Sequence, residues 1–179
     1  MKKRLLLPFL LIITVCCNAQ KVKNTSYISG SGEKVLRLEF TLPLDQKTSW
    51  KLFTTNEQLK KWVAPIVDID LSTGGFMLTN YDSTKTLEDS STIELGIVNY
   101  IDNELITFKV NLNDHFKPNL RREDGNLQEL VQFKPVGKRK TKIISSMVGW
   151  GKGSDWDKTY DFFGKGNTWT YEQMLKVIK

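Results

Sequence analysis

The stretch WDKTYDFFGKGNTWTYEQML, residues 156 to 175, decides the fold of this chain. Its large side chains recur at steps of three and four, which places them on one stripe of a helix that begins after Ser154 as N-cap. The stripe consists of Trp156, Tyr160, Phe163, Asn167, Tyr171, Met174 and Ile178. Gly164 and Gly166 each cost a helix about 1 kcal/mol relative to Ala. We therefore expect a long C-terminal helix that is stabilised by burying its stripe against another element.

A sheet is the expected partner of this helix. Residues 35–42, VLRLEFTL, alternate between apolar and polar side chains, which is the two-residue period of a half-buried strand. Six further runs have strand composition and are separated by turn sequences such as STGG, IDNE and PVGK. These runs are residues 66–70, 74–80, 90–101, 104–112, 127–135 and 140–150. We expect a seven-stranded antiparallel sheet.

Helical spacing interrupts the strands only once, between residues 43 and 65. Asp45 is placed to cap a first short helix that carries Trp50 and Phe53. Thr55 and Gln58 have the spacing of a capping box for a second helix, and Pro65 is expected to end it. The resulting order of strand, two short helices, six strands and long helix is the helix-grip plan. The fold class is therefore α+β, with a curved seven-stranded antiparallel sheet wrapped around a long C-terminal helix.

Residues 1–19 have the pattern of a secretory signal peptide, with charges at Lys2, Lys3 and Arg4, an apolar run and a small residue at Ala19. The apolar run is too short to span a bilayer. Cleavage would leave Gln20 at the N-terminus of a periplasmic or secreted protein, with no stable membrane insertion. Lipid attachment at Cys16 or Cys17 is the alternative, although neither follows the small residue that a lipobox requires.

The expected mature chain is one domain of 160 residues, with residues 20–34 as a flexible lead-in and residues 35–179 as the folded part. Both cysteines lie in the signal segment, so the mature protein has no disulfide. Loss of the three N-terminal cations lowers the formal charge from +6 to +3, and the remaining basic residues do not cluster. Nucleic acid is therefore not an expected partner.

No catalytic or metal-binding pattern stands out, and we predict no catalytic residue, no metal site and no cofactor. His115 is the only histidine and is interpreted as a surface loop residue. Asp68 and Asp70 alternate on one strand, where the solvent face of an edge strand explains them better than a catalytic pair.

The residues carry a family resemblance from about Val35 to Lys179. It rests on WKLFTTNEQLKKWVAP, the Gly74-Gly75 pair, GIVNYIDNELITF and MVGWGKGSDWDKTYDFFGKGNTWTYEQML. Together these resemble the SRPBCC superfamily, which includes START domains and the birch pollen allergen, and within it the C-terminal domain of the activator of heat-shock protein 90 ATPase. The resemblance implies a cavity between sheet and long helix. It does not imply one activity, and the signal segment argues against a cytosolic chaperone role.

If the fold forms such a cavity, it brings Trp62, Trp150, Trp156, Tyr160, Phe163 and Trp169 to one end. The predicted cavity-lining residues are Trp62, Phe108, Phe133, Ser145, Met147, Trp150, Trp156, Tyr160 and Phe163. We expect a non-enzymatic protein that binds a small apolar or amphipathic molecule, such as a lipid or metabolite.

Two alternatives remain open at this point. A cyclase or aromatase-like enzyme would need a polar group in the cavity, which Tyr160, Ser145 or Glu129 could supply. A protein-interaction module would need an exposed apolar patch. The sequence gives no indication of the oligomeric state.

Overall fold

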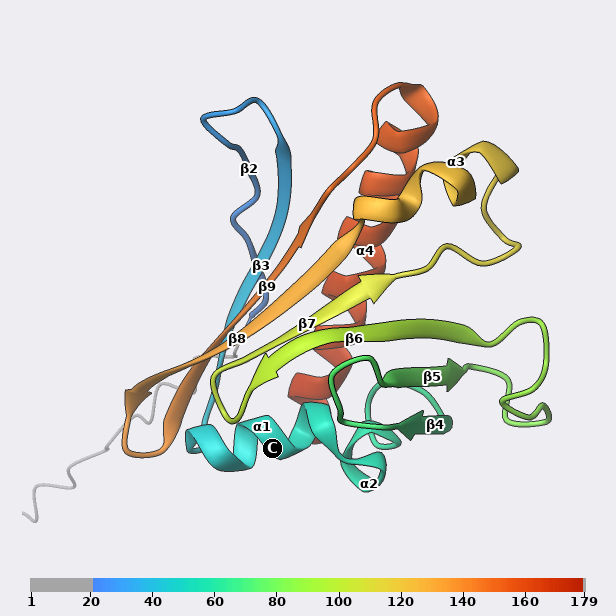
Figure 1. Ribbon diagram of the computed structural model, residues 1–179. Coiled ribbons are helices and arrows are strands. Elements are labelled where there is room, and N and C mark those ends of the chain that lie inside the picture. The colour runs from blue at the N-terminus through green and yellow to red at the C-terminus, as the bar shows by residue number, and fades with distance from the viewer. Residues whose placement is uncertain (1–20, 179) are drawn as a thin grey trace, which may run out of the picture.

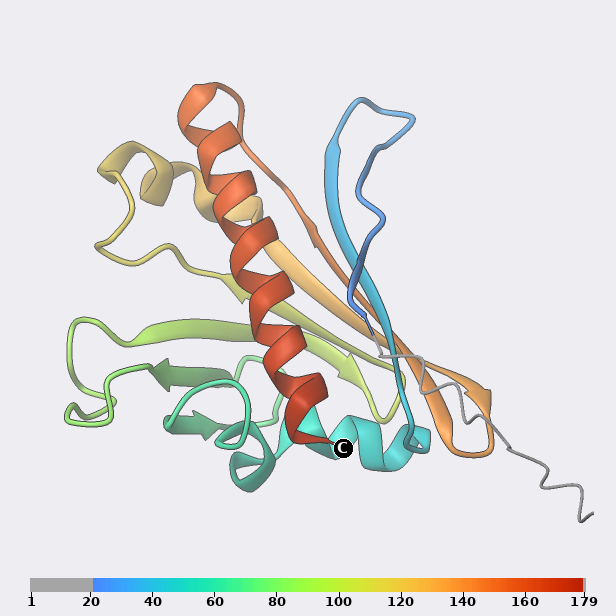
Figure 2. The same cartoon turned by 180° about the vertical axis from the view of Figure 1, so that it is seen from behind.

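A computed structural model describes residues 21–178 of the chain (Figure 1). The expected signal segment, with Cys16, Cys17 and the cleavage point before Gln20, lies outside the described residues. In the described part, a curved antiparallel sheet lies on one side of a single long helix, α4 (Ser154–Val177), which crosses its concave face. Figure 2 shows α4 in front of the sheet, with its C-terminal end beside α1 (Gln46–Thr54).

Nine strands form the sheet within residues 21–178, and every pairing is antiparallel. Seven of them correspond to the predicted strands: β3 (Lys34–Leu42), β4 (Ile66–Ile69), β5 (Phe76–Asn80), β6 (Ile93–Ile101), β7 (Leu105–Val110), β8 (Gln128–Gly137) and β9 (Lys140–Val148). Their order is β3-β9-β8-β7-β6-β5-β4, so the first and last strands of the sequence are neighbours. The helix-grip architecture is confirmed, with a slightly larger strand count.

The two additional strands come from the segment that was expected to be a flexible lead-in. β1 (Lys23–Asn24) and β2 (Tyr27–Ile28) both pair with β3. The side chain of Val22 is only 4% exposed and packs into the core. The structure therefore corrects the expectation of a flexible lead-in. Polar residues of this segment form hydrogen bonds with backbone groups at the edge of β3. For example, the Ser26 hydroxyl accepts a hydrogen bond from the backbone N–H of Arg37 at 2.9 Å.

Helix α1 begins as the sequence predicts, because the Asp45 carboxylate accepts a hydrogen bond from the Thr48 N–H at 2.9 Å. The capping box predicted for α2 (Asn56–Leu59) is wrong. The Thr55 hydroxyl donates backwards to the carbonyl of Lys51, so it makes no cap, and α2 ends at Leu59, well before Pro65. At α4, Gly153 takes the N-cap position that we assigned to Ser154, and the helix continues without a break through Gly164 and Gly166.

A short helix, α3 (Pro118–Glu123), and a single 3₁₀ turn, η1 (Asp124–Asn126), lie between β7 and β8, where the sequence predicted no helix. Leu120 explains why this segment folds, since its buried side chain packs against the start of α4. Gly149 is required where the chain passes this segment. Its φ of 79° is left-handed, and a Cβ there would collide with the carbonyl oxygen of Asn126.

The core between sheet and α4 is divided into two clusters. The main cluster contains α1, the central strands and the C-terminal half of α4, with Phe53, Phe133 and Tyr171 among its rings. The end cluster contains the beginning of α4 and the α3 segment. Its buried members are Leu36, Val110, Leu112, Leu120, Leu127, Met147, Trp150 and Trp156. The cavity described next lies where the two clusters meet.

Candidate functional site: a cavity beneath helix α4

A cavity of about 150 Å³ lies between the sheet and the middle of α4. Strands β5 to β8 supply one wall, α4 supplies the opposite wall, and the α2 region closes one end. Its lining consists of Phe53, Leu59, Trp62, Val63, Met77, Thr79, Tyr81, Ile93, Leu95, Phe108, Val110, Glu129, Val131, Phe163, Asn167, Thr170 and Tyr171. Most of these side chains are apolar because the inward positions of the strands alternate with polar outward ones.

One carboxyl group interrupts this apolar wall. Glu129 stands on β8 two residues before Val131, so both side chains point inward from the same face of the sheet. Its Oε1 atom accepts a hydrogen bond from the Ser145 hydroxyl at 2.6 Å and another from the Tyr171 hydroxyl at 2.9 Å. The carboxyl group is thus fixed between the sheet and α4.

Burial changes the ionisation of this group. It raises the pKa of Glu129 above the ordinary value of 4.5, and the hydrogen bonds from Ser145 and Tyr171 oppose that rise only in part. Burial, reinforced by the nearby Glu129 charge, also raises the pKa of Tyr171 well above 10, so this phenol stays a hydrogen-bond donor at neutral pH. The Glu129 carboxyl group can therefore present an acceptor oxygen to the cavity when it is ionised, or a weakly acidic proton when it is protonated.

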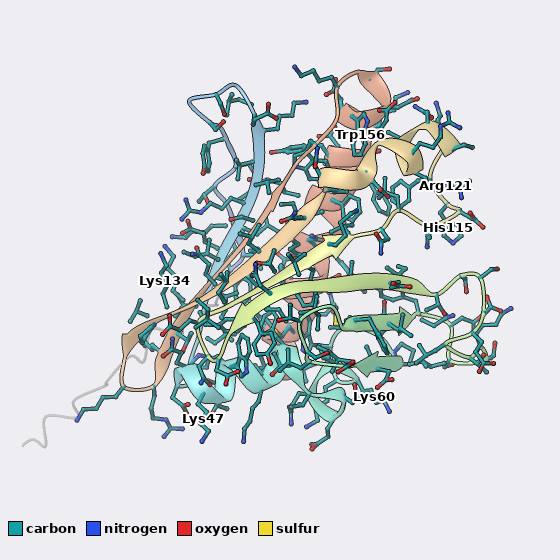
Figure 3. The ribbon with its side chains drawn as sticks, in the orientation of Figure 1. Lys47, Lys60, His115, Arg121, Lys134 and Trp156 are labelled. Atoms are coloured by element: carbon teal, nitrogen blue, oxygen red, sulfur yellow. The ribbon has the colours of Figure 1, made fainter. Side chains whose placement is uncertain are left out.

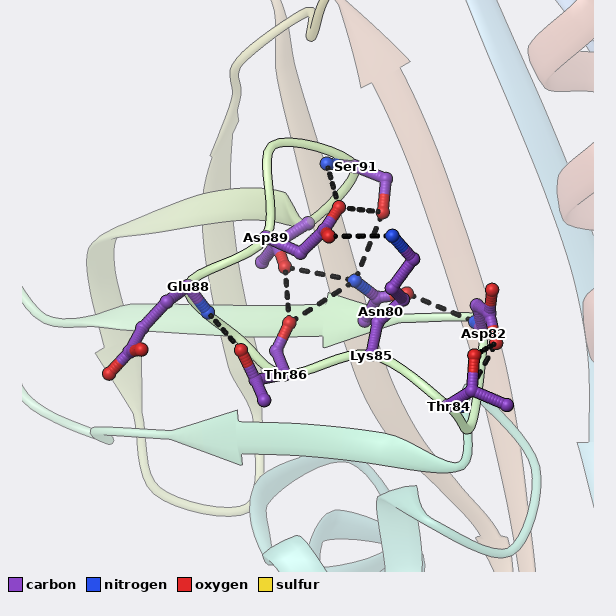
Figure 4. A network of polar contacts seen from close by, with 9 residues as sticks. Asn80, Asp82, Thr84, Lys85, Thr86, Glu88, Asp89 and Ser91 are labelled. Carbon is purple, nitrogen blue, oxygen red and sulfur yellow. Dashed lines mark hydrogen bonds and ion pairs between the residues drawn. The ribbon is translucent and has the colours of Figure 1, made fainter.

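Tyr81 lines the cavity and is also 55% exposed, from which we infer that the mouth of the cavity lies beside this residue. Tyr81 begins the loop between β5 and β6, and polar contacts hold this loop together (Figure 4). The buried Asn80 side chain donates to the Ser91 and Thr92 hydroxyls at 3.1 Å, and Lys85 pairs with Asp89 at 2.9 Å. The network positions the backbone on both sides of Tyr81, so the mouth is a structured feature.

Three of the nine residues that we expected to line the cavity do so, namely Trp62, Phe108 and Phe163. Phe133, Ser145 and Met147 are buried but do not belong to its lining. Phe133 makes edge-to-face contacts with Trp50 and Phe53 at centroid distances of 5.2 and 5.1 Å, which fill the space around it.

The expectation that the remaining aromatic residues surround the cavity is wrong. Trp150 packs edge-to-face on Trp156 and Tyr160 at 6.4 and 5.0 Å, so these rings fill the end cluster with one another. The indole N–H of Trp156 donates to Glu123 at 2.8 Å, which fixes the ring away from the cavity. Trp169 is 60% exposed and borders a separate groove beside α4, with Asn24 and Leu36.

Sequence reasoning assigned one of the polar groups incorrectly. Ser145 and Glu129 were named as polar groups that could enter the cavity, and they are hydrogen-bonded to each other. Tyr160 was the third, but its hydroxyl lies near the carbonyl of Val35, at 3.4 Å. Tyr171 takes its place. A signal for Tyr171 was present, because it lies on the predicted stripe and is the stripe's other tyrosine.

The other candidate residues lie outside this site. His115 is exposed in the segment between β7 and α3, at one edge of the molecule (Figure 3). Asp68 accepts a hydrogen bond from Asn56 at 2.8 Å on the edge strand β4. In the described part of the chain, no group of three or more His, Cys, Asp or Glu side chains is placed to hold a metal ion. Among residues 21–178, no helix is long and apolar enough to cross a membrane.

Solved structures share this architecture at low sequence identity. CalU16 from Micromonospora echinospora has a TM-score of 0.63 and 10% identity, covering 90% of this chain and 87% of that chain. The Aha1 dimer from Colwellia psychrerythraea has a TM-score of 0.59 and 12% identity, covering 81% and 98%. An HSP90 activator from Plasmodium falciparum has a TM-score of 0.51 and 14% identity, covering 76% and 88%. These likenesses establish the fold.

The sequence itself identifies the family. No curated protein matches the chain at a significant level. A family model described as activator of Hsp90 ATPase homolog 1-like protein, however, matches residues 45–179, the range that contains every described helix and all the strands that line the cavity. The chain therefore belongs to the family of activator of Hsp90 ATPase homolog 1-like proteins.

Proposed function

We propose that the protein binds a small apolar or amphipathic molecule in the cavity beneath α4. The observation that carries this proposal is the empty apolar volume of about 150 Å³ with a mouth beside Tyr81. An engineered cavity of about this size, lined by Leu, Ile and Phe, binds benzene. The buried part of the ligand is accordingly one ring or a short alkyl group, and a longer molecule would extend through the mouth.

Uptake of toluene tests this proposal directly, because toluene has the size of the cavity and no polar group. We expect isothermal titration or NMR titration to show saturable binding to the purified protein. The variant Leu95→Phe places a larger ring in the lining and should abolish binding. Trp169→Ala removes an exposed ring outside the lining and should leave binding unchanged. A folded wild-type protein that takes up no toluene would contradict the proposal.

Export is a second part of the proposal and rests on the pattern of residues 1–19. A protein that matures by simple cleavage should be recovered from the cell envelope or medium with Gln20 at its N-terminus. Intact-mass spectrometry of the recovered protein tests this expectation. An N-terminal acylated cysteine, at position 16 or 17, would instead show a lipid-anchored protein.

A second candidate function is that of a protein-interaction module. It is favoured by the family description and by the HSP90 activator among the structures of similar fold. The test is to add the protein in stoichiometric excess to an HSP90 from the same host and to measure ATP hydrolysis. A rise in the rate that Leu95→Phe leaves intact would favour this function, because that variant alters the cavity and not the outer surface.

A further inference from the structure

The charge of the cavity wall is one-sided. Among the seventeen residues that line it, Glu129 is the only acid, two are tyrosines, and none is Lys, Arg or His. No salt bridge within residues 21–178 includes Glu129. A carboxylate in an apolar wall is costly unless it is paired or hydrogen-bonded. The protein thus provides hydrogen bonds to this group without providing a countercharge.

The hydrogen bonds to Glu129 are also one-sided. Both Ser145 and Tyr171 donate to Oε1, and no side chain of the described residues donates to Oε2. Within the described residues, only Arg37 and Ser49 have fully buried side-chain polar atoms without a hydrogen-bond partner. Oε2 of Glu129 is therefore not fully buried, and because Glu129 lines the cavity, we take the cavity to be the space that this oxygen contacts. An acceptor with free lone pairs therefore faces the interior.

The opposite wall repeats this preference. On α4, Thr170 uses its hydroxyl proton on the carbonyl of Gly166 at 3.0 Å, and the Asn167 amide nitrogen points to the sulfur of Met147 at 3.4 Å. The oxygens of these two side chains remain as acceptors beside the cavity. These oxygens on α4 and Oε2 of Glu129 can therefore accept hydrogen bonds from a ligand, while the hydroxyls of Thr79 and Tyr81 in the same lining can also donate.

We infer that the cavity selects molecules that carry a protonated amine on a body of one ring or a short alkyl chain, with the ammonium directed at Glu129. An ammonium group has three N–H donors and no acceptor, which matches the free oxygens, and its charge compensates the carboxylate. An anionic amphiphile such as a fatty acid would place a second negative charge beside Glu129 and is rejected. This inference rests on the proposed function, since it names the class of ligand for the same cavity.

Three probes with the same ring and different head groups test the inference: benzylamine, toluene and benzoate. Near neutral pH we expect benzylamine to bind the wild-type protein about tenfold to a hundredfold more tightly than toluene, the range for a hydrogen bond to a charged group. Benzoate should bind more weakly than toluene. Isothermal titration measures the three affinities on one preparation, so the comparison does not depend on a variant.

Glu129→Gln then identifies the residue responsible. This variant keeps the shape and the acceptor oxygen but removes the charge, and it should lose most of the preference for benzylamine while toluene still binds. The matched control is Glu94→Gln, which removes an equal charge from an exposed position on β6 outside the lining. It should leave the preference unchanged. Circular dichroism confirms that both variants are folded.

The possible results are distinguishable. If toluene binds and benzylamine binds no more tightly, or if Glu129→Gln keeps the preference, the inference is overturned and the proposed function stands. If none of the three probes binds to the folded wild-type protein, the proposed function fails, and the inference fails with it.

Discussion

The two halves of α4 cover the sheet in different ways. The N-terminal half is rich in aromatic residues and packs against the end cluster without a cavity. There, Trp156 packs against Trp150 and donates a hydrogen bond to Glu123. The C-terminal half has fewer rings but covers a cavity, with Tyr171 bound to Glu129 beneath it. On α4, the filled end of the core therefore lies beneath the half with more rings, although other elements also place aromatic side chains around the cavity. A polar residue in the inward register of a strand marks where it is left open.

The largest expected effect concerns the closed half. Trp156 is 2% exposed and its indole nitrogen is hydrogen-bonded, so Trp156→Ala removes packing and leaves the Glu123 carboxylate without that donor. We expect a loss of about 3–5 kcal/mol in the free energy of unfolding, the range for removing a core aromatic residue. Urea denaturation at constant pH measures it. A loss below about 1 kcal/mol would show that the end cluster is not closely packed.

A pair of enlarging substitutions distinguishes the two halves by available space. Leu127 is fully buried in the end cluster, so Leu127→Phe should cost about 1–3 kcal/mol through overpacking. Leu95 lines the cavity, and Leu95→Phe should cost less than about 1 kcal/mol because the added atoms enter empty volume. The melting temperatures of the two variants provide the comparison. Equal losses at both positions would contradict the difference between the halves.

The fold was largely predictable because its signals are periodic. Alternation identified β3, strand composition between turn sequences identified β4 to β9, and the spacing of three and four identified the buried stripe of α4. Errors arose where one residue had two possible partners. Thr55 donates a hydrogen bond to a carbonyl and does not cap α2. The polar lead-in pairs with the edge of β3, because the free backbone groups of an edge strand can pair with a segment of almost any sequence.

The cavity was less predictable for a physical reason. Periodicity shows which side chains point inward but not whether they fill the space between them. Trp150 and Phe133 were expected to line the cavity. Both are buried, but their rings contact neighbouring rings closely enough to leave no room for a ligand beside them. Glu129 was the better guide, because an inward carboxyl group requires partners that its sequence neighbours do not provide.

The pH dependence of stability sharpens the comparison for the open half. Because burial raises the pKa of Glu129, the folded protein binds this proton more tightly than the unfolded chain does. The associated stability is present below about pH 4.5 and is lost as the pH rises through the folded-state pKa. The two titratable side chains that interact electrostatically with Glu129 are Tyr81 and Tyr171. Their pKa values are raised above 10, so both phenols remain neutral while Glu129 titrates.

Glu129→Gln should remove this dependence. We expect the free energy of unfolding of the variant, relative to that of the wild-type protein, to increase as the pH is raised from about 4 to about 8. Surface carboxylates with lowered pKa values, such as Asp45 and Asp155, contribute less to the stability of the protein as the pH falls. This contribution changes equally in the variant and in the wild-type protein. Urea denaturation across that range measures the difference. A difference that does not vary with pH would show that Glu129 titrates as an exposed group.

The smallest effect is expected at Trp169, the aromatic residue that sequence reasoning grouped with those around the cavity. Its ring is 60% exposed and borders an open groove beside α4, and it is not a member of either core cluster. Trp169→Ala should therefore change the free energy of unfolding by less than about 0.5 kcal/mol, as is usual for surface substitutions. Chemical denaturation of this variant beside Trp156→Ala compares two tryptophans of one helix that differ mainly in burial. A loss at Trp169 as large as that at Trp156 would mean that α4 is buried on both faces, and that the distinction between its closed and open halves omits a third contact surface.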